Sequence, residues 1–111
     1  MHDKPFPLQG IRIFDFAWFL ASAGGTRFLA AMGAESYKVE WKDNPDTRLA
    51  GMAPVGGRAA RDAATGPLPG VRDPDMGGNF LNKNSGKRGI SLNIRHPKGL
   101  QIAKDMLRIC D

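Results

Sequence analysis

Residues 11–40 read IRIFDFAWFLASAGGTRFLAAMGAESYKVE, and this stretch decides the fold class. Its first part, residues 11–16, is a nearly continuous run of β-branched and aromatic residues, which predicts a strand covered on both faces. Its last part, residues 36–40, predicts a second strand. A helix between them completes a strand–helix–strand unit of about 30 residues, which favours parallel strands and a right-handed crossover.

The helix of this unit is expected over residues 20–32. Gly33 follows it directly and is the type of residue that ends a helix in the left-handed conformation. Two glycines in its first turns, Gly24 and Gly25, weaken the helix, which indicates close packing or a ligand at that point. A spacing near four residues defines the expected inner face, which comprises Leu20, Gly24, Phe28 and Met32.

Residues 42–79 differ in composition from the rest of the chain. Prolines and glycines are frequent there, and no apolar period survives. A stretch of this length without secondary structure predicts either a functional loop or a disordered one. The same stretch is basic, with Arg48, Arg58, Arg61 and Arg72.

Regular structure is expected again after this loop. Residues 88–94 include alternating apolar and polar side chains, which predict a strand with one polar face. Pro97 suits the first position of a following helix. One face of that helix is apolar and is expected to be buried, namely Leu100, Ala103, Met106, Leu107 and Cys110.

Together these elements predict an α/β fold. It is a Rossmann-like partial domain with parallel strands, in the order strand, helix, strand, long loop, strand, helix. The expected strands have open edges, which parallel sheets do not normally leave uncovered. We therefore expect the chain to be the front part of a larger protein or a protomer that needs a partner.

Composition narrows the class of partner. The 111 residues carry a net charge of +5 and have a pI near 9.8, which favours a nucleotide-bearing ligand, nucleic acid or an acidic membrane surface. The single cysteine, Cys110, excludes an internal disulfide framework and a metal site built on cysteine pairs. No apolar run approaches the roughly 20 residues that span a bilayer, and the start has no signal-peptide core. A cytoplasmic protein is the expectation.

Three blocks of sequence carry a family resemblance. They are residues 7–16, PLQGIRIFDF; residues 28–40, FLAAMGAESYKVE; and residues 84–99, NSGKRGISLNIRHPKG. In this order they resemble the opening of the family III CoA-transferases and that family's LLADLGAEVIKVE and NRNKRSITLDLRHPEG passages. The family includes formyl-CoA:oxalate and carnitine-type CoA-transferases and related acyl-CoA racemases. The resemblance implies that residues 1–111 are the N-terminal, CoA-binding part of such an enzyme.

The resemblance also implies a chemistry. Family members move CoA between an acyl-CoA thioester and a free carboxylic acid through a mixed anhydride on an aspartate. That aspartate is expected beyond residue 111, so we expect no catalytic residue and no turnover from these residues alone. Coenzyme A and acyl-CoA are substrates rather than permanently bound cofactors, and the family forms interlocked homodimers.

Coenzyme contacts carry over from the family to three places in this sequence. The first is Leu20 and Ala21, after the first strand, although Leu20 is equally consistent with a core position. The second is Trp41 and Lys42, where many relatives have an arginine directly after the glutamate. Here Trp41 is expected either to stack on adenine, with Lys42 supplying charge, or to pack against its own sheet. The third is Leu92, Asn93, Ile94 and Arg95, of which Arg95 is the strongest candidate for a phosphate contact.

Four other polar residues have a structural and a functional interpretation. Lys87 and Arg88 either add charge to this site or are solvated loop charges. Asp15, the acid within an apolar strand, is expected to cap the following turn rather than to catalyse. His96 precedes Pro97 and is expected to cap the last helix rather than to act as a base. No His, Asp and Glu cluster has metal-ligand spacing, so no metal site is expected.

Three alternatives remain open from the sequence. An acyl-CoA racemase or isomerase of the same fold would use an acid/base pair that is also expected beyond this chain. A basic nucleic-acid-binding module would gather its basic residues on one helix or stripe, whereas here they are scattered over loops, strand ends and helix faces. Nucleic acid and membranes are therefore not expected partners. A non-catalytic fragment is the third alternative.

Overall fold

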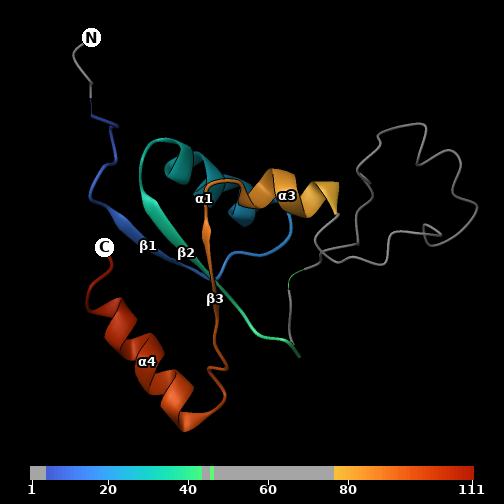
Figure 1. Cartoon of the computed structure of the whole chain (residues 1–111), viewed down its shortest axis with the longest axis vertical. Helices are drawn as coiled ribbons and strands as arrows, with labels where there is room; N and C mark the ends of the chain where they lie inside the picture. Colours follow the sequence, from blue (N-terminus) through green and yellow to red (C-terminus); the bar gives the residue numbers. More distant parts are fainter. Residues whose placement is uncertain (1–4, 44–45, 47–76) are drawn as a thin grey trace, which may run out of the picture.

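Strand β1, Arg12–Asp15, lies at one edge of a three-stranded parallel sheet in the computed structural model, which describes residues 5–43, 46 and 77–111 (Figure 1). It pairs with β2, Glu35–Glu40, so that Asp15 lies opposite Lys38. Strand β2 also pairs with β3, Arg88–Ser91, and is therefore the central strand. Because all pairs are parallel, the carboxyl ends of the strands meet at one edge of the sheet.

Three helices accompany the sheet. Helix α1, Ala21–Ala31, packs on β2 and on the short helix α3, Gly78–Asn84. Helix α4, Pro97–Leu107, lies away from them on the opposite side of the strands (Figure 1). The chain after α4 returns to β1, where the Asp111 N–H donates to the Arg12 carbonyl over 2.9 Å and the Asp111 carboxylate accepts from the Arg12 N–H over 3.0 Å.

The expected α/β fold class, with its parallel strands, is confirmed. Gly33 follows α1 with a φ of 104°, as expected for a helix that ends at a left-handed glycine. Two details of the expected order are wrong. Helix α3 stands where the sequence predicted the end of the loop, and the third strand ends at Ser91 rather than Ile94. Most of the expected loop and its arginines, Arg48, Arg58, Arg61 and Arg72, lie outside the described residues.

The expected inner face of α1 is also wrong. Its large members are exposed, with Phe28 at 63%, whereas Ala23 is completely buried. The reason lies in the spacing of Ala23 and Thr26, which share a helix face three residues apart. A small residue lets the helix approach the sheet closely, and the Thr26 hydroxyl bonds to Asp15 beneath it.

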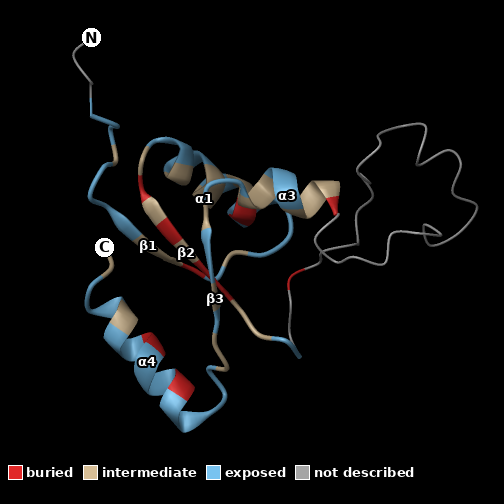
Figure 2. Cartoon of the chain, viewed as in Figure 1, coloured by how far each residue is buried: buried red, intermediate tan, exposed pale blue. Residues whose placement is uncertain are grey.

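The expected face of α4 is correct only in its centre. Ala103 is buried and Met106 is half-buried, but Leu100 and Leu107 are exposed. Cys110, expected to be buried, is half-buried. The buried part of α4 faces the strands (Figure 2).

The interior between sheet and helices is unusually polar. Apart from Val39, the buried hydrophobic residues are alanines, and the largest fully buried side chains are Asp15 and Ser36. Every buried side-chain nitrogen and oxygen of the described residues nevertheless has a hydrogen-bond partner. In this part of the chain, no helix is long and apolar enough to cross a membrane.

Candidate functional site

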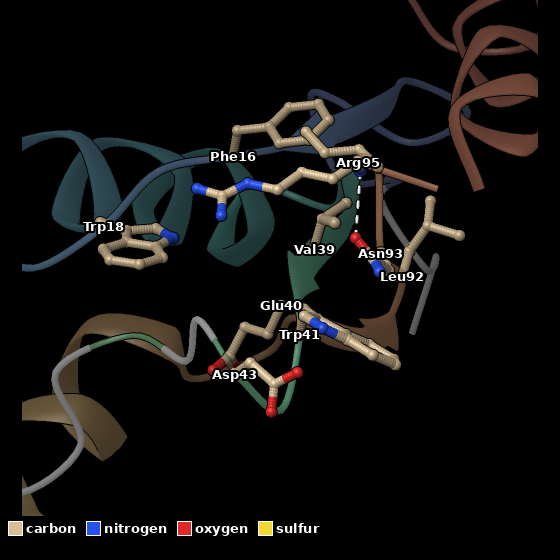
Figure 3. Close-up of a pocket in the computed structure, with 10 residues that line it drawn as sticks. Phe16, Trp18, Val39, Glu40, Trp41, Asp43, Leu92, Asn93 and Arg95 are labelled. Carbon is tan, nitrogen blue, oxygen red and sulfur yellow. Dashed lines mark hydrogen bonds between the residues drawn. The ribbon is translucent and has the colours of Figure 1, made fainter. Parts of the chain in front are cut away.

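A pocket lies at the edge of the sheet where the three strands end. Its volume is about 240 Å³. Each strand contributes the residues that follow or end it, which is where parallel α/β sheets bind ligands (Figure 3). The lining residues are Phe16, Trp18, Val39, Glu40, Trp41, Asp43, Leu92, Asn93, Ile94 and Arg95.

The first wall of the pocket follows β1. Phe16 packs edge-on against Phe14, with ring centroids 4.8 Å apart, which fixes its ring. Trp18 comes next on the same wall, and Phe19 after it has a φ of 60°, in the left-handed region. For a bulky residue this conformation costs about 1–3 kcal/mol and persists only where surrounding contacts enforce it.

The second wall follows β2. Trp41 is half-buried and presents an aromatic surface to the pocket. Lys42 does not line the pocket, but its ammonium group lies 5.7 Å from the centre of the Trp41 ring and 3.4 Å from the Asp43 carboxylate. Charge at this wall is therefore mixed, with Glu40 and Asp43 inside and Lys42 beside it.

The third wall, residues 92–95, follows β3 and is built by local hydrogen bonds. The Asn93 side-chain oxygen accepts from the Arg95 N–H over 3.0 Å, and the Asn93 carbonyl accepts from the His96 N–H over 3.1 Å. Helix α4 begins directly behind this turn, and a Cβ on Gly99 would overlap the Asn93 carbonyl oxygen. The close approach of Gly99 thus fixes where Asn93 and Arg95 lie.

Arg95 is the basic residue of the pocket. Its guanidinium group makes no hydrogen bond or ion pair with another described residue, whereas the Arg95 backbone is held by Asn93. In Figure 3 the side chain extends toward the side of the pocket formed by Phe16 and Trp18. A free guanidinium beside aromatic faces can bind a phosphate and pack against a planar base at the same time.

Five of the eight residues predicted to contact the coenzyme line this pocket, namely Trp41, Leu92, Asn93, Ile94 and Arg95. The other three do not. Lys42 is beside the pocket, and Leu20 and Ala21 lie at the start of α1, where Leu20 is 46% exposed and therefore not a core residue. Phe16 and Trp18 were not predicted, although both lie within three residues of the end of β1, which was the available signal.

A polar cluster whose side chains do not line the pocket lies between α1 and the sheet. The Asp15 carboxylate lies 2.9 Å from the Lys87 ammonium, and both side chains are 1% exposed. Thr26 and Ser36 donate to the same carboxylate over 2.8 and 3.2 Å. Lys87 also donates to the Ala23 carbonyl and to Asn84, so all three of its protons have acceptors.

This cluster settles two expectations. Lys87 is neither a solvated charge nor part of the pocket, because its ammonium group forms a buried ion pair with the Asp15 carboxylate. Asp15 has the expected structural role, since its second oxygen accepts from the Ala17 N–H two residues later over 2.7 Å. Burial by itself raises the pKa of Asp15, but hydrogen bonds from Lys87, Ala17 and Thr26, together with the Lys87 charge, lower it below its usual value.

The remaining candidates have structural roles or none. His96 caps α4, as expected, because its Nδ1 accepts from the Lys98 N–H over 3.2 Å. Arg88 is exposed and lies 3.4 Å from the Glu35 carboxylate, at the opposite end of β3 from the pocket. Within the described residues, no group of His, Cys, Asp and Glu side chains could hold a metal ion.

Comparison with known proteins identifies the family. The model of CoA-transferase family III matches residues 8–111. The chain belongs to this family. The resemblance carried by the three sequence blocks is therefore confirmed.

Curated relatives in this family are much longer than the chain. Succinyl-CoA:glutarate CoA-transferase of Mus musculus is 33% identical over 98% of this chain, which covers 21% of that relative. Formyl-CoA:oxalate CoA-transferase of Afipia carboxidovorans is 31% identical over 94% of this chain and 20% of its own length. The chain thus spans about a fifth of these relatives.

A solved structure supports the fold. The chain aligns with a CaiB/BaiF family protein from Brucella suis with a TM-score of 0.72 and 24% identity, over 97% of this chain and 25% of that protein. This likeness concerns the arrangement of strands and helices.

Proposed function

We propose that the pocket at the strand ends binds the nucleotide end of coenzyme A, and that residues 1–111 form the CoA-binding part of a CoA-transferase. The observation that carries the proposal is that aromatic side chains meet the Arg95 guanidinium at this edge of the sheet, where it has no hydrogen bond or ion pair to another described residue. Family membership supports the class of ligand.

The pocket suits one part of the coenzyme. Its volume of about 240 Å³ is smaller than the sites that enclose whole drug-sized ligands. An adenine ring would pack against Trp41 or Trp18, and a phosphate would pair with Arg95. The carboxylates of Glu40 and Asp43 repel phosphate, so the phosphates are expected on the Arg95 side and not deep beside β2.

Membership of the family supports a CoA-transfer reaction, for which we propose an aspartyl anhydride mechanism. A carboxylate of an aspartate beyond these residues attacks the thioester carbonyl, the carbon–sulfur bond breaks, and the CoA thiolate leaves. The acyl group is then held as a mixed anhydride with the aspartate. The thiolate attacks the aspartate carbonyl of this anhydride, which releases the donor acid as a carboxylate and forms an aspartyl–CoA thioester. The acceptor carboxylate displaces the thiolate to give a second mixed anhydride, and attack of the thiolate on its acyl carbonyl forms the new acyl-CoA and frees the aspartate. These residues contribute binding and orientation of the coenzyme. The relatives of the chain are CoA-transferases, which favours this reaction over racemisation.

We also propose that the functional protein is an interlocked homodimer. The predicted loop 42–79 connects β2 to α3, apart from its last two residues, which belong to α3. Exposed large apolar side chains support an interface with a second subunit, because Phe28, Leu107 and Ile109 are each more than half exposed. Sedimentation at increasing concentration tests this part independently, and a monomer at all concentrations would contradict it.

Titration calorimetry of the chain with coenzyme A tests the binding proposal. Coenzyme A is expected to bind, whereas pantetheine, which lacks the nucleotide, is expected to give no heat. Replacing Arg95 with Ala removes a charged hydrogen bond and is expected to weaken binding about tenfold. Arg88→Ala, an exposed arginine at the other end of β3, is the matched control. Equal affinity for both ligands, or for the Arg95 and Arg88 variants, would contradict the proposal.

A further inference from the structure

An ion pair between Lys38 of β2 and Asp46 lies behind the pocket. The Lys38 Nζ is 2.8 Å from the Asp46 Oδ2, and the two side chains are 3% and 2% exposed. Neither residue lines the pocket. A pair buried this deeply loses much hydration, so it is stable only if its other polar atoms also find partners.

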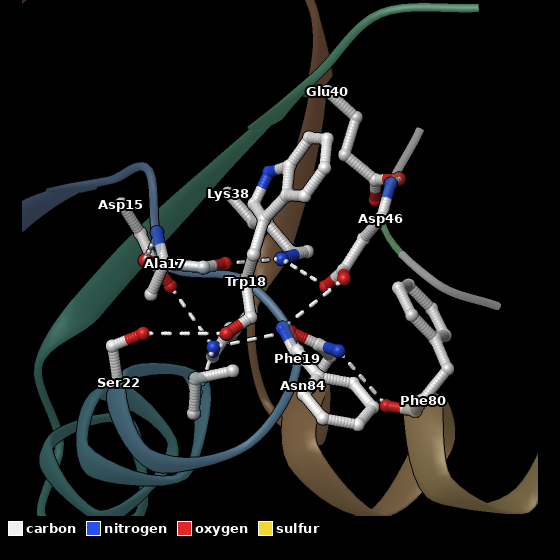
Figure 4. A network of polar contacts seen from close by, with 12 residues as sticks. Asp15, Ala17, Trp18, Phe19, Ser22, Lys38, Glu40, Asp46, Phe80 and Asn84 are labelled. Atoms are coloured by element: carbon white, nitrogen blue, oxygen red, sulfur yellow. Dashed lines mark hydrogen bonds and ion pairs between the residues drawn. The ribbon is translucent and has the colours of Figure 1, made fainter. Parts of the chain in front are cut away.

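Those other atoms hold the backbone on both sides of Trp18 (Figure 4). The Lys38 ammonium donates to the Ala17 carbonyl over 2.6 Å, and the Asp46 Oδ1 accepts from the Phe19 N–H over 3.1 Å. Phe19 is the residue with the left-handed φ of 60°, a conformation that needs such an external contact. The pair therefore determines the backbone path from which the Trp18 side chain reaches the pocket.

The same pair contacts a second wall. The Asp46 N–H donates to the Glu40 carboxylate over 3.1 Å, and Glu40 ends β2 and lines the pocket. Asp46 thus links the segment after β1 with the end of β2. It does so through two hydrogen bonds to residues 19 and 40 and one ion pair to Lys38.

From these contacts we infer that the Lys38–Asp46 pair positions Trp18 for ligand binding without touching the ligand. That the ligand is the nucleotide end of coenzyme A rests on the proposed function. The position of Trp18 does not, because it follows from contacts within the chain. Lys38 and Asp46 are positioning residues, and their effect on binding passes through the 17–19 backbone.

The test uses the full chain labelled with 5-fluorotryptophan. Its ¹⁹F spectrum contains one resonance from Trp18 and one from Trp41, assigned through Trp41→Phe. The variants are Asp46→Ala, which removes the contacts with the Phe19 N–H and with Lys38, and Lys38→Met/Asp46→Asn, which removes the ion pair without leaving either partner as a lone buried charge. Asp105→Asn is the matched control, because Asp105 forms an exposed pair with Arg108 on the far helix.

Without ligand, both pocket variants are expected to shift and broaden the Trp18 resonance more than that of Trp41. Their affinity for coenzyme A is expected to fall about tenfold, whereas Asp105→Asn changes neither quantity. Folded variants with an unmoved Trp18 resonance overturn the inference. A double variant that does not fold also overturns it, because the pair would then support the whole fold and not one wall.

The two proposals fail in different ways. If the unmodified chain does not bind coenzyme A while the Trp18 resonance responds to Asp46→Ala, the proposed function is wrong and the positioning role stands. If the chain binds coenzyme A and both variants bind it equally well, the proposed function stands and the positioning role is wrong.

Discussion

Lys87 precedes β3 and Arg95 follows it, yet their charged groups have opposite surroundings. Lys87, just before β3, is buried against Asp15 and has a partner for every proton. Arg95, after β3, has a guanidinium group without a hydrogen bond or ion pair to any described residue. The first charge holds α1 and α3 on the sheet, and the second is available to an anion.

The difference is set by the neighbours of each charge. Asp15 lies on the face of the sheet that α1 covers, so a cation that reaches this face meets a buried carboxylate. At the edge with the pocket the carboxylates have other partners, since Asp43 faces Lys42 and Glu40 accepts from Asp46. A basic residue near a strand end is thus a candidate for anion binding only if it forms no ion pair with a buried acid.

Replacing Lys87 with Met is expected to give the largest effect. It leaves Asp15 buried without its cation, which destabilises a protein by about 3–5 kcal/mol. Urea denaturation followed by circular dichroism measures the loss. Arg88→Met, next in the chain but exposed, is expected to stay within about 0.5 kcal/mol. If the two variants were equally stable, the buried pair would not hold the fold.

Protonation of Asp15 at low pH is expected to lower the stability of the chain less than Lys87→Met does, because the contacts of Thr26 and Ser36 with Asp15 survive it. The pKa of Asp15 is lower in the folded chain than in the unfolded chain. Its stabilising contribution is therefore complete above about pH 4 and is lost as the pH falls through the folded value. Urea midpoints measured from neutral pH downward should decrease in this range. Asp15→Asn should flatten the profile, and an unchanged slope would contradict the assignment.

The substitution Gly99→Ala tests whether the position of residues 93–95 determines ligand binding in the pocket. The Cβ of Gly99→Ala would overlap the Asn93 carbonyl oxygen, so residues 93–95 must move. We expect a loss of about 1–3 kcal/mol in stability together with weaker binding of coenzyme A, because Arg95 moves with this turn. Gly89→Ala on β3 has open space around its Cβ and is the control. Unchanged coenzyme affinity in a folded Gly99→Ala variant would contradict this account of the third wall.

The sequence predicted the parallel fold because its signals are local. The β-branched run at 11–16 and the left-handed Gly33 each act through neighbouring residues, and both elements are found close to where they were expected. The third wall of the pocket was predicted differently, because its residues 92–95 were carried over from the resemblance to the family.

The errors concern partners that are distant in sequence. Lys87 binds Asp15 across 72 positions, and no periodicity indicates that contact. The inner face of α1 was predicted from large apolar residues, but the helix lies close to a polar interior that needs Ala23 and Thr26. Helix α3 has neither an acidic first turn nor a buried residue, so its sequence resembles the preceding loop.

The substitution Gly25→Ala is expected to change stability the least, and it separates the packing of α1 from ligand binding in the pocket. The sequence left open whether the glycines of α1 serve close packing or a ligand. A Cβ on Gly25 meets no atom within 4 Å, and the residue is exposed in the helix interior. Gly25→Ala should therefore stabilise the chain by about 0.5–1 kcal/mol through the lower backbone entropy of the unfolded state.

The affinity of the Gly25→Ala chain for coenzyme A tests whether the glycines of α1 serve a ligand. Calorimetry is expected to show an unchanged affinity, because α1 does not line the pocket. Gly33→Ala is the control of opposite sign, since Gly33 has a φ of 104° and its Cβ would overlap Phe6. A Gly25→Ala chain that is more stable but binds coenzyme A more weakly would place part of the ligand on α1, next to Leu20 and Ala21, and would extend the site beyond the three walls.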